Sequence, residues 1–293
     1  MRADEEQVAF TQRAAVSSLA EPDVRFVLER LTRGPEGVLD VVEGGARLVA
    51  ALVERSESEA SAATLLVLGL EGGAADRAQL FARALDDALA LASSGPRRHL
   101  RVPLPPGLTA LAPTLVARGL TALFVSYTMR TRDAHVPAPP ASAGTFVDWS
   151  PSMSAAPVRD LVMRAFAGAP DLIPVSVEDL HARLDAARPR PRLLVDGGEL
   201  LGVCRTSGPD AAGVGRVPMI AREPARRGLR LGDVLLVEAK RVLAAAGARC
   251  FELEVAAENR SALGLYQRHG FEVVSEETTF GRELERASGA RGR

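Results

Sequence analysis

A tyrosine lies in a short segment near the C-terminus, "NRSALGLYQRHGF" at residues 259–271, whose apolar residues have the spacing of a helix that runs into a strand. Asn259 would begin this helix, where its side-chain oxygen can accept a hydrogen bond from a free backbone N–H. The phenol of Tyr266 could deliver a proton during a reaction, or its ring could simply pack where the helix meets a sheet. The residue types alone leave both interpretations open.

A second segment, "REPARRGLRLGDVLL" at residues 222–236, joins an apolar strand to a long helix through an Arg-Gly turn. Such a junction leaves backbone N–H groups without partners at the helix start, where the helix dipole also favours negative charge. A pyrophosphate would fit there. An ordinary glycine-containing turn between a strand and a helix would explain the same residues.

Candidate bases are few. Glu252 and Glu254 alternate with apolar residues in the predicted strand 250–256, so both project from the same side of that strand. They could act as bases or form a solvated strand face. Because the predicted strand 214–221 has no carboxylate, deprotonation through water is a further alternative. His269 ends the helix, where the dipole favours a cation, and we assign it no catalytic role.

Composition excludes several classes of protein. The chain has 36 basic and 37 acidic residues and a net charge of −1, so no global field would attract nucleic acid or an anionic membrane. We find no apolar run long enough to span a bilayer and no signal peptide in "MRADEEQVAF", which predicts a cytoplasmic protein. Cys204 and Cys250 are isolated and are predicted to be free thiols rather than zinc ligands. Neither a P-loop nor a Rossmann fingerprint occurs.

The 293 residues fit two domains, and the halves of the chain resemble each other. "VEGGARLVAAL" (42–52) and "VDGGELLGVCR" (195–205) each predict a strand, a Gly-Gly turn and a second strand. Further along, residues 108–125 align with residues 259–276. The two alignments have offsets of 153 and 151 residues, which indicates a tandem duplication of an α/β unit.

The periodicity predicts a mixed sheet with helices packed on it, an α/β (α+β) fold. In the C-terminal half we expect strands at 145–149, 214–221 and 250–256, a hairpin at 192–205, and further strands after Phe271. Helices are expected near 157–167, 176–187, 229–246 and 259–269. Glu238 and Arg241 of the long helix are expected to reach solvent. We divide the chain into a domain at 1–132, a linker at 133–144, a domain at 145–285 and a flexible tail at 286–293.

The two chemical segments, in this order and with one strand between them, resemble the GNAT superfamily of acyl-CoA-dependent N-acyltransferases. The family's last helix reads Asn-x-x-Ala-x-x-Leu-Tyr-x-x-x-Gly-Phe, and every position is matched here by Asn259, Ala262, Leu265, Tyr266, Gly270 and Phe271. Its loop reads Arg/Gln-x-x-Gly-x-Gly/Ala. The motifs cover residues 145–282, and residues 1–132 are included only through the internal repeat. This layout is similar to that of mycothiol synthase and related double-GNAT proteins.

The resemblance implies that acetyl-CoA is the co-substrate and that an amine, of a small molecule or a peptide, is the acceptor. Backbone N–H groups of the loop would hold the pyrophosphate, and residues 219–222 would line the pantetheine arm. Tyr266 would be the general acid for the coenzyme thiolate and Glu254 the candidate base. The residues expected to contact the coenzyme are Ile220, Ala221, Arg222, Arg227, Gly228, Leu229, Arg230, Leu231, Gly232, Asp233 and Asn259.

The loop departs from the family pattern at its centre, where Arg230 replaces the expected glycine. Glycine usually serves where the backbone approaches a ligand closely or has positive φ. Arginine keeps the N–H and adds a cation that could reach a coenzyme phosphate. Asp233 suits the dipole, but it would repel a phosphate if it pointed inward, so we expect it to point away.

The N-terminal repeat lacks these residues. Leu108 aligns with Asn259, Leu115 aligns with Tyr266, and the loop at 69–81 has no basic residue before its glycines. We therefore expect a degenerate GNAT-like domain followed by a catalytic one. The alternative is a non-catalytic acyl-CoA-binding sensor or scaffold, which the replacement at Arg230 and the lack of an obvious base would favour.

Overall fold

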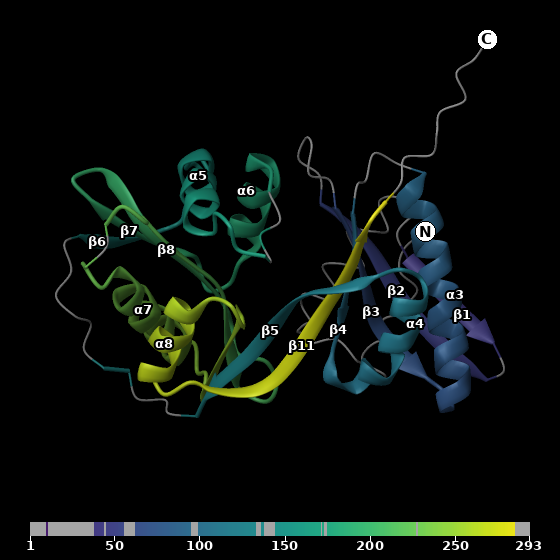
Figure 1. The fold of residues 1–293 in the computed structure, drawn as a ribbon. Helices are drawn as coiled ribbons and strands as arrows, with labels where there is room; N and C mark the ends of the chain where they lie inside the picture. The colour runs from purple at the N-terminus through teal and green to yellow at the C-terminus, as the bar shows by residue number, and fades with distance from the viewer. Residues whose placement is uncertain are drawn as a thin grey trace, which may run out of the picture. The chain divides into compact units, whose positions relative to one another are not determined.

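The structure is a computed structural model that describes Phe10 and residues 38–43, 45–55, 62–94, 99–132, 136–137, 144–170, 172, 175–226 and 228–284 (Figure 1). Most of the expected linker at 133–144 and all of the expected tail at 286–293 lie outside the described residues. The chain forms two compact units: unit 1 comprises residues 1–125 and 277–293, and unit 2 comprises residues 126–276. The expected limits of independently folding domains stay predictions.

Unit 2 contains the elements expected for the C-terminal half, with ends that mostly differ by one or two residues. They are β6 (Thr145–Asp148), α5 (Ala156–Ala165), α6 (Val177–Ala186), β7 (Arg192–Asp196), β8 (Glu199–Ser207), β9 (Val214–Arg222), α7 (Leu231–Ala245), β10 (Cys250–Ala256), α8 (Arg260–Arg268) and the first part of β11 (Glu272–Glu283).

Unit 1 repeats the second part of that order: a hairpin, a third strand, a helix, a fourth strand, a short helix and a last strand. Its elements are β1 (Val38–Glu43), β2 (Ala46–Arg55), β3 (Ala62–Glu71), α3 (Ala74–Ser93), β4 (His99–Leu104), the 3-10 helix η2 (Pro106–Leu111), α4 (Ala112–Ala117) and the first part of β5 (Thr121–Thr131). The tandem repeat predicted from the sequence is confirmed.

The strands follow the order β1-β2-β3-β4-β11-β5-β10-β9-β8-β7-β6. The last strands of the two repeats are therefore exchanged. Strand β10 pairs antiparallel with β5, with Val255 opposite Tyr127, and β4 pairs antiparallel with β11, with Val102 opposite Phe280. Residues 126–131, which precede the linker, thus complete the sheet of unit 2.

Strands β9 and β10 are parallel neighbours that separate early. Their pairing covers three positions and ends at Arg216 and Glu252, although β9 continues to Arg222 and β10 to Ala256. The register between β8 and β9 shifts near the same place: between its pairings at Arg216 and Met219, β9 has one residue more than β8. An extra residue of this kind bends a strand, which explains why β9 leaves β10.

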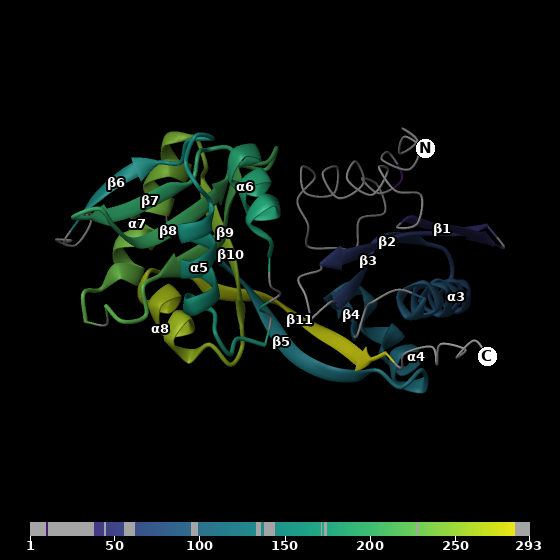
Figure 2. The ribbon, with the colours of Figure 1, turned by 90° about the horizontal axis from the view of Figure 1, so that it is seen from above.

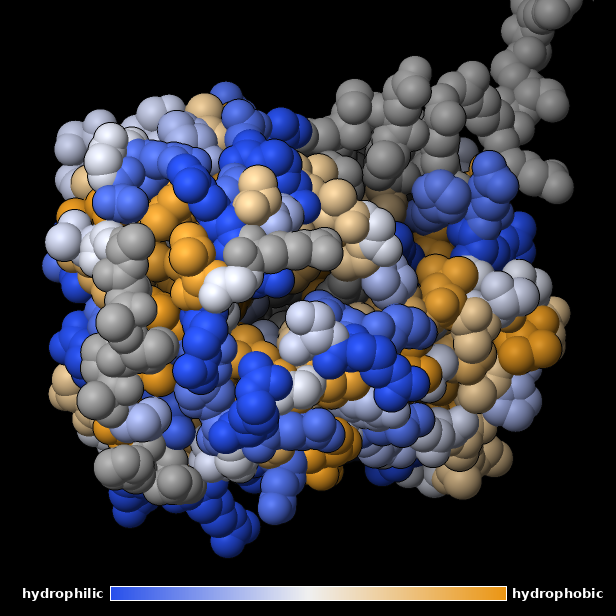
Figure 3. Space-filling model, turned by 60° about the vertical axis from the view of Figure 1, so that its left-hand side comes forward, coloured by the Kyte–Doolittle hydropathy of each residue, from blue (hydrophilic) through white to orange (hydrophobic). Residues whose placement is uncertain are grey.

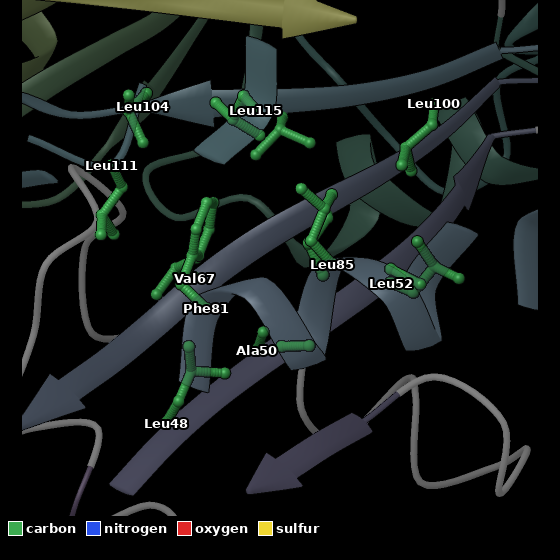
Figure 4. Packing of buried hydrophobic residues seen from close by; sticks show 14 of the residues in the cluster. Leu48, Ala50, Leu52, Val67, Phe81, Leu85, Leu100, Leu104, Leu111 and Leu115 are labelled. Atoms are coloured by element: carbon green, nitrogen blue, oxygen red, sulfur yellow. The ribbon is translucent and has the colours of Figure 1, made fainter. Parts of the chain in front are cut away.

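Helices lie on both sides of the unit 2 strands (Figure 1), and an apolar cluster joins each pair of helices to the sheet. One cluster joins α7 and α8 to the sheet through residues such as Leu235, Leu263 and Phe251. The other joins α5 and α6 through Leu161, Leu184 and neighbouring residues. In unit 1, α3 and α4 pack on one side of the strands (Figure 2), and leucines fill the space between them (Figure 4).

The expectation that Glu238 of α7 reaches solvent is wrong. This side chain is buried, and its carboxylate is 2.7 Å from Nε of Arg192 and 2.7 Å from both Nε and Nη2 of Arg241. Helical periodicity does not show that strand β7 supplies Arg192 as a partner, and two guanidinium groups offset the cost of burying the acid.

Large apolar side chains exposed on the described surface are few, and hydrophobic residues form separate groups on the face drawn in Figure 3. The exposed large apolar side chains include Val42, Leu229 and Val273. Among the helices that the structure describes, none is long and apolar enough to cross a membrane.

Candidate active site

The start of α7 presents free backbone donors. Its first intrahelical hydrogen bond runs from the Val234 N–H to the Arg230 oxygen at 3.1 Å, and no side chain caps the helix. The N–H groups of Leu231, Gly232 and Asp233 therefore lie ahead of the hydrogen-bond ladder, at the positive end of the dipole. The structure thus has an anion-favouring helix start where the sequence predicted one. Arg227 lies outside the described residues.

The turn before α7 is left-handed at two positions. Gly228 has φ of +88°, and Arg230 has φ of 50° and ψ of 30°, the only positive φ of a non-glycine residue in the described ranges. This conformation costs an L-residue roughly 1–2 kcal/mol, which explains why the family pattern has glycine here. Leu229, between them, is largely exposed. The Arg230 side chain is also largely exposed, with Nη2 3.3 Å from Oδ1 of Asp233.

Asp233 lies against α8. Its side chain is buried, and Oδ1 is 3.0 Å from Nε2 of His269, the last residue before Gly270. Burial alone would raise the pKa of this carboxyl, but the hydrogen bonds from His269 and Arg230 outweigh burial and lower it. Asp233 is therefore ionised at neutral pH, and its charge is opposed from α8 and from the turn.

Gly232 allows α8 to approach the start of α7. A Cβ at this position would lie 3.0 Å from Cδ2 of Leu265, a distance tighter than most contacts of real side chains. Even an alanine here would require the Leu265 side chain to shift by a few tenths of an ångström. The small residue in the loop pattern and the Leu-Tyr pair in the helix pattern thus meet at one packing contact.

Three positions of the α8 motif have local structural roles. The Asn259 side chain caps the helix by accepting a hydrogen bond from the Ala262 N–H at 3.1 Å. At the other end, Gly270 has φ of +79°, and a Cβ there would meet only Oγ1 of Thr131 at 3.5 Å. Glycine is therefore needed for its backbone conformation and not for space. Phe271 is fully buried in the cluster beneath α7 and α8.

Tyr266 is half-buried on the same cluster, with its ring centroid 6.0 Å from that of Phe271. Its hydroxyl has no hydrogen-bond partner among the described residues. Burial raises the pKa of Tyr266 to about 12. The phenol therefore keeps its proton at neutral pH and can act as a donor.

The predicted arm-lining residues occupy the separated part of β9. Ile220 packs against the α7 and α8 cluster, whereas Ala221 is buried on the α5 and α6 side. These residues and Arg222 pair with β8, and the pairing between β9 and β10 has already ended at Arg216. The edge of β9 that faces β10 is therefore suited to an added, strand-like ligand.

The two acids of β10 have different surroundings. Glu252 is buried, with one carboxylate oxygen 2.9 Å from Nε of Arg130 and the other 3.1 Å from Nε of Arg216. Glu254 is exposed and lies opposite Thr128 of β5. Only Glu254 is thus accessible to a substrate. No sequence pattern indicated Arg130 as the partner of Glu252, because Arg130 precedes the linker.

The described part of the chain contains no group of three His, Cys, Asp or Glu side chains that could hold a metal ion. Cys204 and Cys250 are free thiols. Burial raises the pKa of Cys204 to about 12 and also raises that of Cys250, so neither thiol is activated as a nucleophile.

The residues of this site lie in a segment that is similar to a known family. Residues 157–271 match the Acetyltransferase (GNAT) family. A mycothiol acetyltransferase of Beutenbergia cavernae is 36% identical over 123 residues, which cover 40% of this chain and 41% of that protein. The match thus spans less than half of the relative's length.

Two solved structures share the fold over most of the chain. A tandem GNAT protein from the clavulanic acid biosynthesis pathway has a TM-score of 0.65 and 19% identity, and the match covers 96% of both chains. A GCN5-related N-acetyltransferase from Sphaerobacter thermophilus has a TM-score of 0.63 and 20% identity, over 92% of this chain and 87% of that one.

Over residues 157–271 the chain is thus similar to the GNAT acetyltransferase family. More particularly, the chain shares the fold of a tandem GNAT protein: the α/β unit occurs twice, and the family's sequence pattern is found in the C-terminal half.

Proposed function

We propose that this protein transfers an acetyl group from acetyl-CoA to a primary amine, and that unit 2 carries the reaction. The observation that carries this proposal is the contact between Gly232 and Leu265, which sets the phenol-bearing helix α8 against the open start of α7. The proposed proton donor and the proposed anion site would thereby lie on two helices in direct contact.

The residues present fit a coenzyme of this kind. The N–H groups of residues 231–233 would bind the pyrophosphate, with Gly228 and Leu229 forming the turn beside it. The separated edge of β9, from Val217 to Arg222, would bind the pantetheine arm as an added strand. The Arg230 guanidinium would reach a phosphate, and the amide of Asn259 could add a contact beyond its role as a helix cap.

Acetyl-CoA supplies a thioester whose carbonyl carbon a neutral amine can attack. An N–C bond forms and the C–S bond breaks, so one proton must leave the nitrogen and one must reach the sulfur. Glu254, directly or through a water, would take the first proton. Tyr266 would donate to the departing sulfur.

Tyr266 would regain its proton quickly after donating it. A thiol has a pKa near 8.5, whereas the pKa of Tyr266 is about 12, so a phenolate formed beside a thiol would recover a proton. The proton lost by the amine balances the one gained by the sulfur. Ionisation of Tyr266 should therefore not limit the rate below about pH 10.

The acceptor is proposed to be a small molecule with a primary amine, since the relative with 36% identity is named for mycothiol. A peptide amine is the alternative. A panel containing both types, assayed for thiol release from acetyl-CoA, would distinguish them.

Tyr266→Phe tests the mechanism. The change removes one hydroxyl while the packing persists, so turnover should fall by about 10²–10⁴-fold at unchanged acetyl-CoA affinity. Tyr127→Phe is the matched control, because the chain has only two tyrosines and Tyr127 packs against the same cluster. Unchanged turnover in folded Tyr266→Phe would show that the phenol is only a packing group.

The same assay separates the enzyme from its rival. A wild-type protein that binds acetyl-CoA but releases no thiol with any amine of the panel would be an acyl-CoA-binding sensor or scaffold.

A further inference from the structure

The proposed coenzyme site contains a charge of the wrong sign. Asp233 is the third residue of α7, and its own N–H is one of the three free donors at the helix start. Its carboxyl has a lowered pKa, so it is negative at neutral pH. A carboxylate that turned toward the bound pyrophosphate would oppose it directly.

The carboxylate is held elsewhere by α8. Oδ1 of Asp233 lies 3.0 Å from Nε2 of His269, and both side chains are about nine-tenths buried. Since a carboxylate only accepts hydrogen bonds, Nε2 is the donor. The ring belongs to a residue whose backbone N–H donates to the oxygens of Leu265 and Tyr266 at 3.3 and 3.0 Å, so its position is set by the end of α8.

Arg230 is a weaker second partner. Its Nη2 lies 3.3 Å from the same Oδ1, but its side chain is mostly exposed and free to exchange with solvent. Burial makes the His269 contact the more persistent of the two. Asp233 is thus tied to the helix that carries Tyr266, on the side of α7 against which that helix packs.

We propose that His269 is a positioning residue for the coenzyme: its Nε2–H holds the Asp233 carboxylate against α8, which leaves the N–H groups of α7 available to phosphate. This inference rests on the proposed function. It also couples the two halves of the site, because the same contact fixes the end of the helix that presents Tyr266.

The test is a double-mutant cycle on acetyl-CoA affinity, measured by calorimetry on the full chain. His269→Ala should weaken binding by about 10-fold or more, since a buried negative charge is left beside the phosphates. Asp233→Asn should tighten binding by about 3-fold. The double variant should bind like Asp233→Asn, because the histidine then has no carboxylate to hold away from the phosphates.

A merely structural contact would behave differently. Both single variants would then weaken binding, and Asp233→Asn would not rescue His269→Ala. That result, or wild-type affinity in folded His269→Ala, overturns the inference. If His269→Ala does not fold, His269→Gln keeps an N–H donor that can hold the carboxylate and should bind acetyl-CoA within about 3-fold of wild type. A loss of about 10-fold or more in folded His269→Gln would overturn the inference.

A substrate without phosphates gives a second readout. In His269→Ala the KM for acetyl-CoA should rise about 10-fold more than the KM for S-acetyl-pantetheine, because only the first carries the pyrophosphate. Equal rises would overturn the inference. A wild-type protein that binds no acetyl-CoA would overturn the proposed function itself. If the wild-type protein binds acetyl-CoA and the variants of His269 and Asp233 bind it equally well, only the role of His269 would be overturned.

Discussion

The parallel strand pair of unit 1 and the corresponding pair of unit 2 separate at the same point. Strands β3 and β4 pair at three positions, ending at Thr64 and Arg101, as β9 and β10 do at Arg216 and Glu252. The short helices that follow both end at a glycine with positive φ, Gly119 at +75° and Gly270 at +79°. The two repeats therefore retain the backbone geometry that a GNAT site uses.

The side chains placed on that geometry differ. Leu115 of α4, aligned with Tyr266, is completely buried in the leucine-rich cluster of unit 1, together with Leu104 and Leu111 (Figure 4). Leu108, aligned with Asn259, is buried in the same cluster. Where unit 2 has a phenol with no hydrogen-bond partner in the part of the chain that the structure describes, unit 1 has a buried leucine, so the proposed proton donor has no counterpart there.

The loops before the two long helices, α3 and α7, differ in how closely they are packed. At Gly72 of unit 1 a Cβ would lie 2.4 Å from Cβ of Ala46. Gly73, the N-cap residue of α3, lies close to the Asp76 carboxylate. At Gly228 of unit 2 nothing lies within 4 Å of such an atom. The loop of unit 1 is packed onto β2 and has an acid beside it, whereas that of unit 2 is open.

The largest expected effect is a difference in coenzyme binding between the units. Calorimetry on the full chain should give one acetyl-CoA per chain. Gly228→Pro should abolish binding, because proline requires φ near −65° and this residue has +88°. Gly73→Ala, at a residue with φ of −65°, is the matched change in unit 1 and should leave the stoichiometry at one. Two equivalents per chain would contradict the view of unit 1 as degenerate.

Arg230 provides the next largest effect, because unit 1 has no basic residue before the glycines of its loop. Arg230→Ala and Arg230→Gly both remove the guanidinium and should each weaken acetyl-CoA binding by about 1.5–3 kcal/mol, the scale of a hydrogen bond to a charged group.

The two variants differ in stability, which separates backbone from side chain. Glycine suits φ of 50° and should raise the free energy of unfolding by roughly 1 kcal/mol over the alanine variant. Tighter coenzyme binding in either variant would mean that the arginine obstructs the site.

A matched pair of glycine substitutions should separate stability from function. Gly119→Ala and Gly270→Ala should each lower the free energy of unfolding by about 1–2 kcal/mol, because both residues have positive φ and neither substitution meets a close atom. Only Gly270→Ala should also lower kcat/KM, since it displaces the end of the helix that carries Tyr266 and His269. An equal loss of kcat/KM in Gly119→Ala would show that unit 1 takes part in catalysis.

Local patterns in the sequence predicted the elements, the repeat and the helix motif. Hydrophobic periodicity located α7 and β10 because their apolar faces are buried, and Asn259 was recognisable as a cap because that role depends on neighbours in sequence. The degenerate positions Leu108 and Leu115 followed from alignment of the repeats.

Contacts between distant residues were not predictable in the same way. The period of a strand says which face is buried but not which strand is its neighbour, so the exchange of β5 and β11 and the pairing of Arg130 with Glu252 were missed. The contact between Asp233 and His269 joins two helices 36 residues apart. The only indication of the left-handed conformation of Arg230 in the sequence was its position at the central glycine of the loop pattern.

The smallest expected effect concerns Asn259, which in unit 1 has become Leu108. Asn259→Ala removes the hydrogen bond to the Ala262 N–H and should lower the free energy of unfolding by about 1 kcal/mol. Asn259→Ser retains a capping oxygen but lacks the amide nitrogen, so its stability should stay within a few tenths of a kcal/mol of wild type. If the amide also contacts the coenzyme, the serine variant should lose acetyl-CoA affinity while remaining stable, and both variants should lose it to a similar extent. If capping is the whole role, the serine variant should bind as wild type does, and any change in the alanine variant should scale with its lost stability. Thermal unfolding and calorimetry on the same two preparations decide between these roles.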